Sequence, residues 1–425
     1  MKQQESHSTA VEDQFVPAGW RRLALGDVGK IVSGITLGRK AGDGKRLRSV
    51  PYLRVANVKD GYLDLSEVFR IDATVDEIEK LSLKPGDLLL TEGGDPDKLG
   101  RGTFWQGELP ECIHQNHIFR VRFNPEEFVP EFLSAQFASP YGKAYFLAHS
   151  KRTTGIATIN QKVLAGFPLL VPPFTVQQRI ARVVREQMAA VERARAAAGA
   201  RLEAAKALPG AYLRNLLHRP THQPWPSRRL GDLLRETRNG LYKPEQFYGA
   251  GTPVVKMFNI GRFDGAWYLE RLDRVRVSPE EMASYSLEVE DLVVNRVNSR
   301  ELVGKCAVIG QDLVGCVFES KNMRIRIDPA SAVPGYIALW LNGIKGREQI
   351  QRRLRQIVGM ATINRSDIET LQVDLPPLPD QEQIVNIHGG RVVAANRARK
   401  AVEGELAAIE ALPGAILGGA FSGEL

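Results

Sequence analysis

A duplicated stretch constrains the fold of this chain more than any other feature of its sequence. The first copy, VPPFTVQQRIARVVREQMAAVERARAAAGARLEAAKALPGA, spans residues 171–211, and the second, LPPLPDQEQIVNIHGGRVVAANRARKAVEGELAAIEALPGA, spans residues 375–415. Pro172 matches Pro376, and the Leu-Pro-Gly near the end of each copy keeps the same offset (376 − 172 = 204). An offset that stays constant along an element indicates an internal duplication.

Each copy predicts a long helix. Pro173 and Pro377 fix φ and push the preceding residues out of the helical region, so a strand must end there. Apolar or small residues then recur at spacings of three and four, which places them on one stripe of a helix. The first stripe consists of Ile180, Val184, Val191, Ala194, Ala198, Leu202, Ala205 and Leu208, and the second of Ile384, Ala395, Ala398, Val402, Leu406, Ile409 and Leu412. The Leu-Pro-Gly step predicts that each helix ends or kinks sharply there.

The two stripes differ in side-chain size at matching positions, as where Val191 corresponds to Ala395. This alternation favours two unlike helices that pack on each other, antiparallel so that a pseudo-twofold axis relates the repeats. A helix from Gln177 to Leu208 would be roughly 48 Å long at about 1.5 Å per residue. The second copy departs from the stripe at His388-Gly389-Gly390, and because glycine weakens a helix interior, this predicts a kink or a partner contact there.

A strand-rich block precedes each long helix, and the two blocks are also copies. The first begins near Trp20 and the second near Trp225, and each contains short β-rich runs broken by glycine. The predicted fold is α+β, with two strand-rich domains separated by two long antiparallel helices in a pseudo-twofold internal repeat. The predicted boundaries are 1–170 for an N-terminal extension with the first domain, 171–219 for the first helix region, 220–374 for the second domain and 375–425 for the second helix region.

Smaller elements keep the offset of 204 within the blocks. Asp87 matches Asp291, and each is predicted to lie in a turn before an apolar strand. Arginines alternate with apolar residues in FRVRF and MRIRI, which predicts strands with one buried face. Asn160 and Asn364 recur in the duplicated ATIN loops, where we expect them to cap the following segment.

Composition favours an intracellular protein with a polyanionic partner. The net charge is +8 and the pI is about 9.3, which fits nucleic acid, although solubility alone is an alternative reason for a basic surface. The three cysteines form no CxxC pair, so a disulfide or zinc framework is not expected. We find no signal peptide and no apolar run long enough to span a membrane, which predicts a cytoplasmic protein.

The chain resembles the specificity subunit of type I restriction–modification systems over nearly its whole length. The resemblance depends on PPFTVQQRI and PPLPDQEQI at the start of the two long helices, on the duplicated ATIN loop and on the order block, helix, block, helix. It implies that each block is a target-recognition domain that reads one half of a bipartite, asymmetric sequence in double-stranded DNA. It also implies that the helices set the spacer and dock two modification subunits that methylate adenine, with restriction (motor) subunits joining through those.

The motifs expected of an enzyme are missing or fragmentary. Glu245-x-x-x-Gly249-x-Gly251 has the spacing of an S-adenosylmethionine loop but follows no apolar strand, and the Asn-Pro-Pro-aromatic signature of amino-methyltransferases does not occur. A phosphate-binding GxxxxGK[ST] motif is also missing. Cys112, His114 and His117 could suggest a metal, but the second block has Phe318 and Lys321 in place of the two histidines. We therefore predict a non-catalytic chain without metal or cofactor, and expect S-adenosylmethionine, Mg and ATP in the partner subunits.

Polar loop residues at matching places in both blocks are the candidates for DNA contact, because reading a base edge needs paired donors and acceptors. In the first block they are Arg54, Asn57, Lys59, Gln115, Asn116, His117, Lys151, Arg152, Thr153 and Thr154, with Arg39, Lys40, Lys45 and Arg46 as phosphate contacts. In the second block they are Lys256, Asn259, Asn295, Arg296, Asn298, Arg300, Ser320, Lys321 and Asn322. The blocks differ most in these loops, so the two half-sites should differ.

The helix residues predicted to meet partner subunits follow from the resemblance. They are Gln178, Ile180, Val184, Val191, Leu202, Gln381, Ile384, Leu406 and Ile409. Two other functions stay open on the sequence. One is a two-headed adaptor or scaffold without DNA specificity, and the other is a self-contained methyltransferase or nuclease, which the motif search disfavours.

Overall fold

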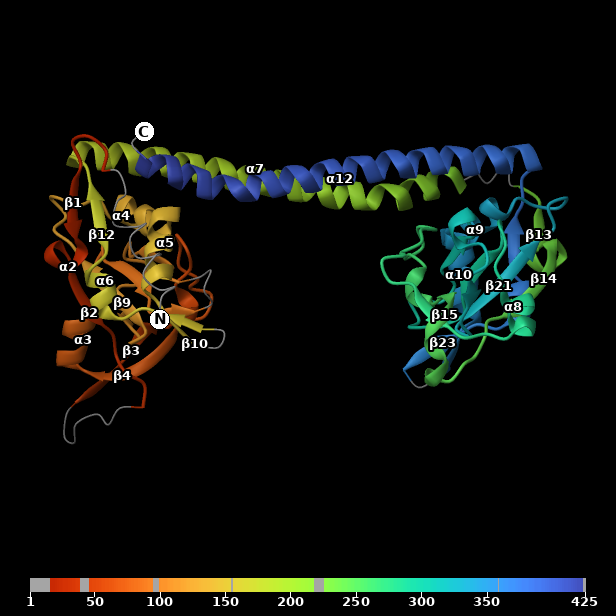
Figure 1. Ribbon diagram of the computed structural model, residues 1–425, viewed down its shortest axis with the longest axis horizontal. Helices are drawn as coiled ribbons and strands as arrows, with labels where there is room; N and C mark the ends of the chain where they lie inside the picture. Colours follow the sequence, from red (N-terminus) through yellow and green to blue (C-terminus); the bar gives the residue numbers. More distant parts are fainter. Residues whose placement is uncertain are drawn as a thin grey trace. The chain divides into compact units, whose positions relative to one another are not determined.

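The computed structural model describes residues 16–38, 46–94, 99–153, 156–217, 225–357 and 359–422. The chain forms two compact units: unit 1 comprises Met1–Ala198 and Glu405–Leu425, and unit 2 comprises Gly199–Gly404. Each unit therefore combines one strand-rich block with part of each long helix (Figure 1). This mixture of helices and strands confirms the predicted α+β class.

Unit 1 is built on small sheets. An antiparallel sheet in the order β2-β9-β5-β7 joins β2 (Lys30–Ser33), β9 (Ile118–Arg122), β5 (Leu88–Thr91) and β7 (Gly102–Phe104). A second sheet in the order β4-β3-β8 contains β4 (Phe69–Thr74), β3 (Leu47–Leu53) and β8 (Ile113–His114), and its β3–β8 pair is parallel. A third sheet, β10-β11-β6, contains β10 (Lys151–Thr153), β11 (Ile156–Thr158) and β6 (Gly93–Gly94), while β1 (Arg21–Ala24) pairs with β12 (Pro168–Val171).

Unit 2 repeats these sheets one by one. The four-stranded sheet has the order β14-β21-β17-β19, from β14 (Leu234–Asn239), β21 (Asn322–Ile327), β17 (Leu292–Asn295) and β19 (Cys306–Val308). The next, β16-β15-β20, contains β16 (Asp273–Val275), β15 (Tyr248–Val255) and β20 (Val317–Phe318). The third, β18-β23-β22, contains β18 (Val297–Asn298), β23 (Met360–Thr362) and β22 (Arg355–Ile357), and β13 (Ser227–Arg229) pairs with β24 (Gln372–Asp374).

Short helices complete each unit and cover its sheets. The longer ones are α4 (Pro130–Ala138) and α5 (Pro140–His149) in unit 1 and α9 (Pro334–Asn342) and α10 (Ile344–Arg353) in unit 2, all with proline or glycine at their beginning. The others are α2 (Leu25–Val28), α3 (Val75–Leu81) and α6 (Gln161–Ala165) in unit 1, and α8 (Pro279–Tyr285) and α11 (Arg365–Glu369) in unit 2. The 3-10 turns are η1 (Val55–Asn57), η3 (Leu230–Leu233), η4 (Glu245–Phe247), η5 (Met257–Asn259) and η6 (Gln311–Leu313).

The predicted asparagine caps are present. Asn160 precedes α6, and its side-chain oxygen accepts a hydrogen bond from the Val163 N–H at 2.9 Å. Asn364 precedes α11 and accepts from the Asp367 N–H at 3.1 Å. Each side chain satisfies one of the free N–H groups at a helix start, which confirms the expectation from the repeated ATIN loop.

The two long helices, α7 (Phe174–Leu217) and α12 (Leu378–Ser422), do not end at the Leu-Pro-Gly steps. Of the two predicted alternatives, a helix end is wrong, since Pro209 and Pro413 lie inside the helices, and a sharp kink at these prolines stays a prediction. Packing explains the continuation: Leu213 after Pro209 is in the core of unit 2, and Phe421 after Pro413 is in the core of unit 1. This burial offsets the loss of one helical hydrogen bond at each proline. α12 also remains helical through Gly389-Gly390, with His388 buried.

In unit 1 the two helices pack on each other in opposite directions, as predicted. Ile180 and Val184 of α7 share a core with Leu417 and Phe421 of α12. Further along α7, Val191 and Ala198 cluster with Ile409, and Arg195 lies 3.8 Å from Glu410 across the pair. As α7 advances, its contacts on α12 move backwards in sequence, so the pair is antiparallel.

The proline-rich start of each long helix is tied to its block by a buried glutamine. The Gln177 side chain accepts from the Val129 N–H at 3.0 Å and donates to the Glu127 and Pro172 carbonyls. Gln381 repeats this, accepting from the Val333 N–H at 2.8 Å and donating to the Pro376 carbonyl at 2.7 Å. This clamp is the physical reason for the Pro-Pro-x-x-x-Gln pattern.

α12 corrects one expectation about membranes. It contains an 18-residue stretch with a mean hydropathy of 1.2, which is long and apolar enough to cross a membrane by length and composition alone. Core helices of soluble proteins pass the same test. Leu417, Ala420 and Phe421 of this helix lie in the core of unit 1, which gives its apolar residues a packing role.

Candidate nucleic-acid interface

The predicted loops of the first block converge at one edge of unit 1. β6 pairs with β11, so the segment after β5 lies beside the β10–β11 hairpin that carries Lys151. The Glu92 N–H donates to the His117 carbonyl at 2.9 Å, which adds the turn at residues 115–117. The Gln115 N–H donates to the Leu53 carbonyl at 2.9 Å, which brings the loop beginning at Arg54 to the same edge.

Unit 2 assembles the same edge from the matching segments. β18 pairs with β23 beside β22, and the Arg296 N–H donates to the Lys321 carbonyl at 2.9 Å. The Glu319 N–H donates to the Val255 carbonyl at 3.0 Å, so the loop beginning at Lys256 joins this edge. The sequence singles out these loops separately, and the tertiary structure shows that they adjoin.

Asn57 and Asn259 hold loops together and cannot read a base. Asn57 is 3% exposed; it accepts from the Arg54 N–H and donates to the Asp64 and Glu67 carbonyls, each at 2.8 Å. Asn259 is fully buried and makes the same three bonds, to the Lys256 N–H and the Tyr268 and Arg271 carbonyls. Both amide donors and the oxygen are engaged, so the prediction of a base contact is wrong for these two residues.

The prediction of a base contact is also wrong for Asn295 and Asn322. Both are fully buried and are joined by a 3.1 Å hydrogen bond between their side chains. Asn295 donates further to the Lys321 carbonyl at 3.0 Å and accepts from the Asn298 amide at 2.8 Å. This network holds the turn that contains Lys321. Asn298 is partly buried, and its amide group already donates a hydrogen bond to Asn295.

Three predicted cations already have acidic or aromatic partners. Arg54 lies 3.0 Å from Glu67 and 3.6 Å above the Phe69 ring, and Lys59 lies 3.9 Å from Asp64. Lys256 lies 2.8 Å from Asp273 and 4.1 Å from the Tyr248 ring. These pairs reduce the positive charge that the three residues can offer to phosphate.

The remaining candidates reach solvent to different degrees. Arg46, His117, Lys151 and Arg300 are exposed, whereas Gln115, Asn116, Arg296, Ser320 and Lys321 are half-buried. Burial lowers the pKa of Arg296. The backbones of Arg152 and Thr153 lie in β10, while Arg39, Lys40, Lys45 and Thr154 lie outside the described residues.

A pair of arginines, one buried and one half-buried, holds the turn before β5 in unit 1 and the turn before β17 in unit 2. Arg122 donates from Nε and Nη2 to the two carboxylate oxygens of Asp87, both at 2.6 Å. Arg120 donates to the Lys80 and Ser82 carbonyls at the end of α3. Asp87 also accepts from the Lys84 N–H at 2.7 Å, so this group closes the turn before β5.

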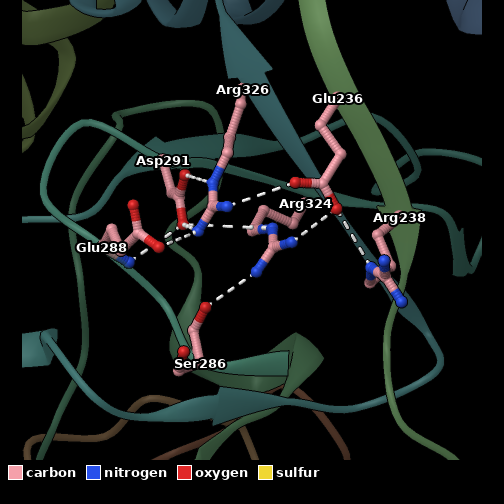
Figure 2. Close-up of polar contacts among 7 residues, drawn as sticks. All are labelled: Glu236, Arg238, Ser286, Glu288, Asp291, Arg324 and Arg326. Atoms are coloured by element: carbon pink, nitrogen blue, oxygen red, sulfur yellow. Dashed lines mark hydrogen bonds and ion pairs between the residues drawn. The ribbon is translucent and has the colours of Figure 1, made fainter. Parts of the chain in front are cut away.

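Unit 2 adds two carboxylates, Glu236 and Glu288, to the same arrangement (Figure 2). Arg326 pairs with Asp291 at 2.8 Å, and Arg324 donates to the Ser286 carbonyl at 2.7 Å. Glu236 on β14 lies 2.7 Å from Arg324 and 3.2 Å from Arg326. Burial alone would raise the pKa of Glu236, but the hydrogen bonds from Arg238 and Arg324 and the charges of Arg324 and Arg326 outweigh it and lower that pKa.

Cys112, His114 and His117, whose spacing could suggest a metal site, do not face a common point. Cys112 and His114 are buried, while His117 is exposed and its Nδ1 lies 2.6 Å from Glu92 Oε2. Within the described ranges, no three His, Cys, Asp or Glu side chains are grouped so as to hold a metal ion.

Comparisons with known proteins cover the whole arrangement, although no family model matches the chain. The chain is 26% identical to the StySPI type I restriction enzyme specificity subunit of Salmonella potsdam and 25% identical to that of EcoKI from Escherichia coli K12, with 96% of this chain and 90% of each relative aligned. Over almost its whole length the chain is therefore similar to type I restriction enzyme specificity subunits. A solved HsdS subunit from Thermoanaerobacter tengcongensis has the same fold, with a TM-score of 0.63 and 18% identity over 97% of this chain and 99% of that one. A second solved chain, from a study of complex assembly in a type I R-M system, matches with a TM-score of 0.71 and 18% identity. The match covers 97% of this chain and 100% of that one.

The helix residues that the family resemblance assigned to partner contact serve mainly the packing of this chain itself. Ile180, Val184, Val191, Ile384 and Ile409 are buried in cores or in the helix pair, and Gln381 forms the clamp. Leu202 and Leu406 are half-buried, and Gln178 is exposed. Burial against the same chain contradicts partner contact for the five buried apolar residues. The apolar stripe on which they lie packs against other parts of this chain, so it is not available to a partner.

Proposed function

We propose that this chain recognises a bipartite, asymmetric sequence in double-stranded DNA, with unit 1 reading one half and unit 2 the other. The observation that carries the proposal is the pair of edges just described. The same backbone hydrogen bonds build both edges, while the half-exposed side chains on them differ. One scaffold with two sets of side chains suits the reading of two unlike half-sites.

The residues that remain accessible divide into two kinds of contact. Gln115, Asn116 and His117 in unit 1, and Arg296, Ser320 and Lys321 in unit 2, lie on the turns of the two edges and are the proposed base readers. Arg46, Lys151 and Arg300 are exposed cations suited to phosphate. Arg54, Lys59 and Lys256 have acidic partners and are proposed to position the loops beside the DNA.

We further propose that the long helices set the spacer between the half-sites and dock two modification subunits. α12 leaves large apolar side chains exposed, namely Ile387, Val393 and Leu412. Exposed apolar side chains on a long helix are suited to contact helices of a partner. These residues replace the buried stripe as the proposed docking contacts.

In this proposal the chain acts in the cytoplasm and catalyses nothing itself. S-adenosylmethionine, for adenine methylation, and Mg and ATP, for any restriction subunits, belong to the partners. The division of labour follows from an edge rich in amides and guanidinium groups, which suits recognition, together with the absence of nucleotide and cofactor motifs in the sequence.

The test is methylation by the reconstituted complex. We expect the modification subunits to methylate adenine within one split sequence only when this chain is present, and we expect duplex binding to weaken steeply with salt. Methyl transfer by the purified chain alone would refute the non-catalytic role. Binding of protein partners without salt-sensitive binding to any split duplex would favour the adaptor alternative.

A further inference from the structure

One position carries opposite charge in the two units although the backbone around it is the same. The Glu92 N–H donates to the His117 carbonyl at 2.9 Å, and the Glu92 carbonyl accepts from Ile159 at 2.8 Å. The Arg296 N–H donates to the Lys321 carbonyl at 2.9 Å, and its carbonyl accepts from Ile363 at 2.9 Å. These four bonds place Glu92 and Arg296 equivalently, so that only their side chains differ.

The turn beside this position also carries different side chains in the two units. In unit 1 the Glu92 carboxylate is held by the His117 ring, Oε2 to Nδ1, at 2.6 Å, with 33% of the Glu92 side chain exposed. In unit 2 the residue matching His117 is Lys321, and Arg296 donates from Nη1 to the Ser320 carbonyl at 3.1 Å. Unit 1 therefore presents an oriented acceptor at the point where unit 2 presents two cations.

The chemistry of base edges makes this difference readable. A carboxylate accepts from the amino group of cytosine or adenine, whereas arginine and lysine donate to O6 and N7 of guanine. A carboxylate near the phosphate backbone would be repelled, so an oriented one on a DNA-facing edge is suited to a base. In the described part of the chain, no hydrogen bond occupies Glu92 Oε1.

We propose that Glu92 and Arg296 are specificity-determining residues of opposite kind. Glu92, oriented by His117, accepts a hydrogen bond from a base amino group in one half-site, and Arg296 with Lys321 donates to guanine in the other. This inference rests on the proposed function of the two edges.

The test exchanges the two pairs in the complete complex and reads the methylated sequence across a host genome. Glu92→Arg with His117→Lys is expected to change the preferred base at one position of one half-site and to leave the other half unchanged. Arg296→Glu with Lys321→His is expected to change only the second half. Affinity for the original duplex should fall roughly 10- to 100-fold in each case.

Two further variants keep the outcome decisive. Glu92→Gln preserves the side-chain shape and should relax the preference at the same base pair. Glu126→Arg makes the same charge change as Glu92→Arg at an exposed position away from this edge and should leave the methylated sequence unaltered. If the unaltered complex methylates one split sequence and folded Glu92 and Arg296 variants methylate the same sequence, the inference is wrong; if the unaltered complex recognises no split sequence, the proposed function itself fails.

Discussion

Asp87 and Arg122 face each other in a two-point contact, with both guanidinium-to-carboxylate distances at 2.6 Å and Asp87 only 1% exposed. The pair joins the turn before β5 to the end of β9 in unit 1. Removal of one partner leaves the other charge partly buried and unpaired, which is more costly than loss of the attraction alone.

We therefore expect Asp87→Ala to destabilise unit 1 by roughly 3 kcal/mol. Hydrogen exchange of β5 and β9 measures the effect, and β17 and β21 in unit 2 serve as an internal reference. Glu126→Ala, an exposed acid in the same unit, is the control and should leave exchange unaltered. Equal protection of β5 in both variants would show that the pair is dispensable.

His114 predicts an acid-sensitive unit 1. Its Nδ1 bonds the Ile118 carbonyl, Nε2 is buried without a partner, and burial, aided by the charge of Arg120, lowers its pKa to about 4. Because the unfolded chain takes up this proton near pH 6.5 and the folded chain only near pH 4, stability is full above 6.5 and falls as the pH drops between these values, by roughly 3 kcal/mol.

The matching residue in unit 2 is Phe318, so His114→Phe should remove this part of the pH dependence. Urea unfolding of unit 1, followed from pH 7 to pH 4, measures it. His149→Gln, at an exposed histidine, should retain the dependence. An unchanged pH profile in His114→Phe would assign acid sensitivity to other groups.

Asn57→Ala should act through folding rather than through base reading. The substitution leaves the Arg54 N–H and two carbonyls without their partner, at a cost of about 2 kcal/mol. We expect weaker binding to one half-site with its base preference retained, together with a lower melting temperature. Asn116→Ala, in the half-exposed turn, is the contrasting variant and should relax base preference without loss of stability.

A half-open pocket of about 160 Å³ lies at the margin of the core of unit 2. It is lined by Leu217, Trp225, Tyr336 and Trp340, among others. In unit 1 the residue matching Leu217 is Phe421, whose ring lies 5.3 Å from Phe132. In unit 2 the smaller Leu217 side chain lines the pocket instead.

Leu217→Phe should fill this pocket and stabilise unit 2 by about 1 kcal/mol, and Phe421→Leu should destabilise unit 1 by a similar amount. Hydrogen exchange of α9 and α4 reports each unit separately. Destabilisation by Leu217→Phe would mean that the walls cannot accept the ring, which is the usual cost of overpacking.

The helix pair predicts how the spacer would respond to insertion. Seven residues inserted after Ala198 and after Val402 preserve the apolar stripe and add about 10 Å to each helix. The tolerated gap between half-sites should grow by about three base pairs, measured from the methylated sequences. Four-residue insertions rotate the stripe and should instead lower helix stability; an unchanged gap with the seven-residue variant would show that the helices do not set it.

The sequence by itself determined the repeat, the antiparallel long helices, the asparagine caps and the family resemblance, because each depends on a constant offset, a helical period or a local motif. Tertiary packing decided the rest. Helices α7 and α12 pass through Pro209 and Pro413 because buried Leu213 and Phe421 stabilise the turns beyond them, and Asn57 turns inward because distant carbonyls meet its amide. A polar side chain can either support a loop or face DNA. Its exposure and its hydrogen-bond partners decide which, and both are set only when segments far apart in the chain pack together.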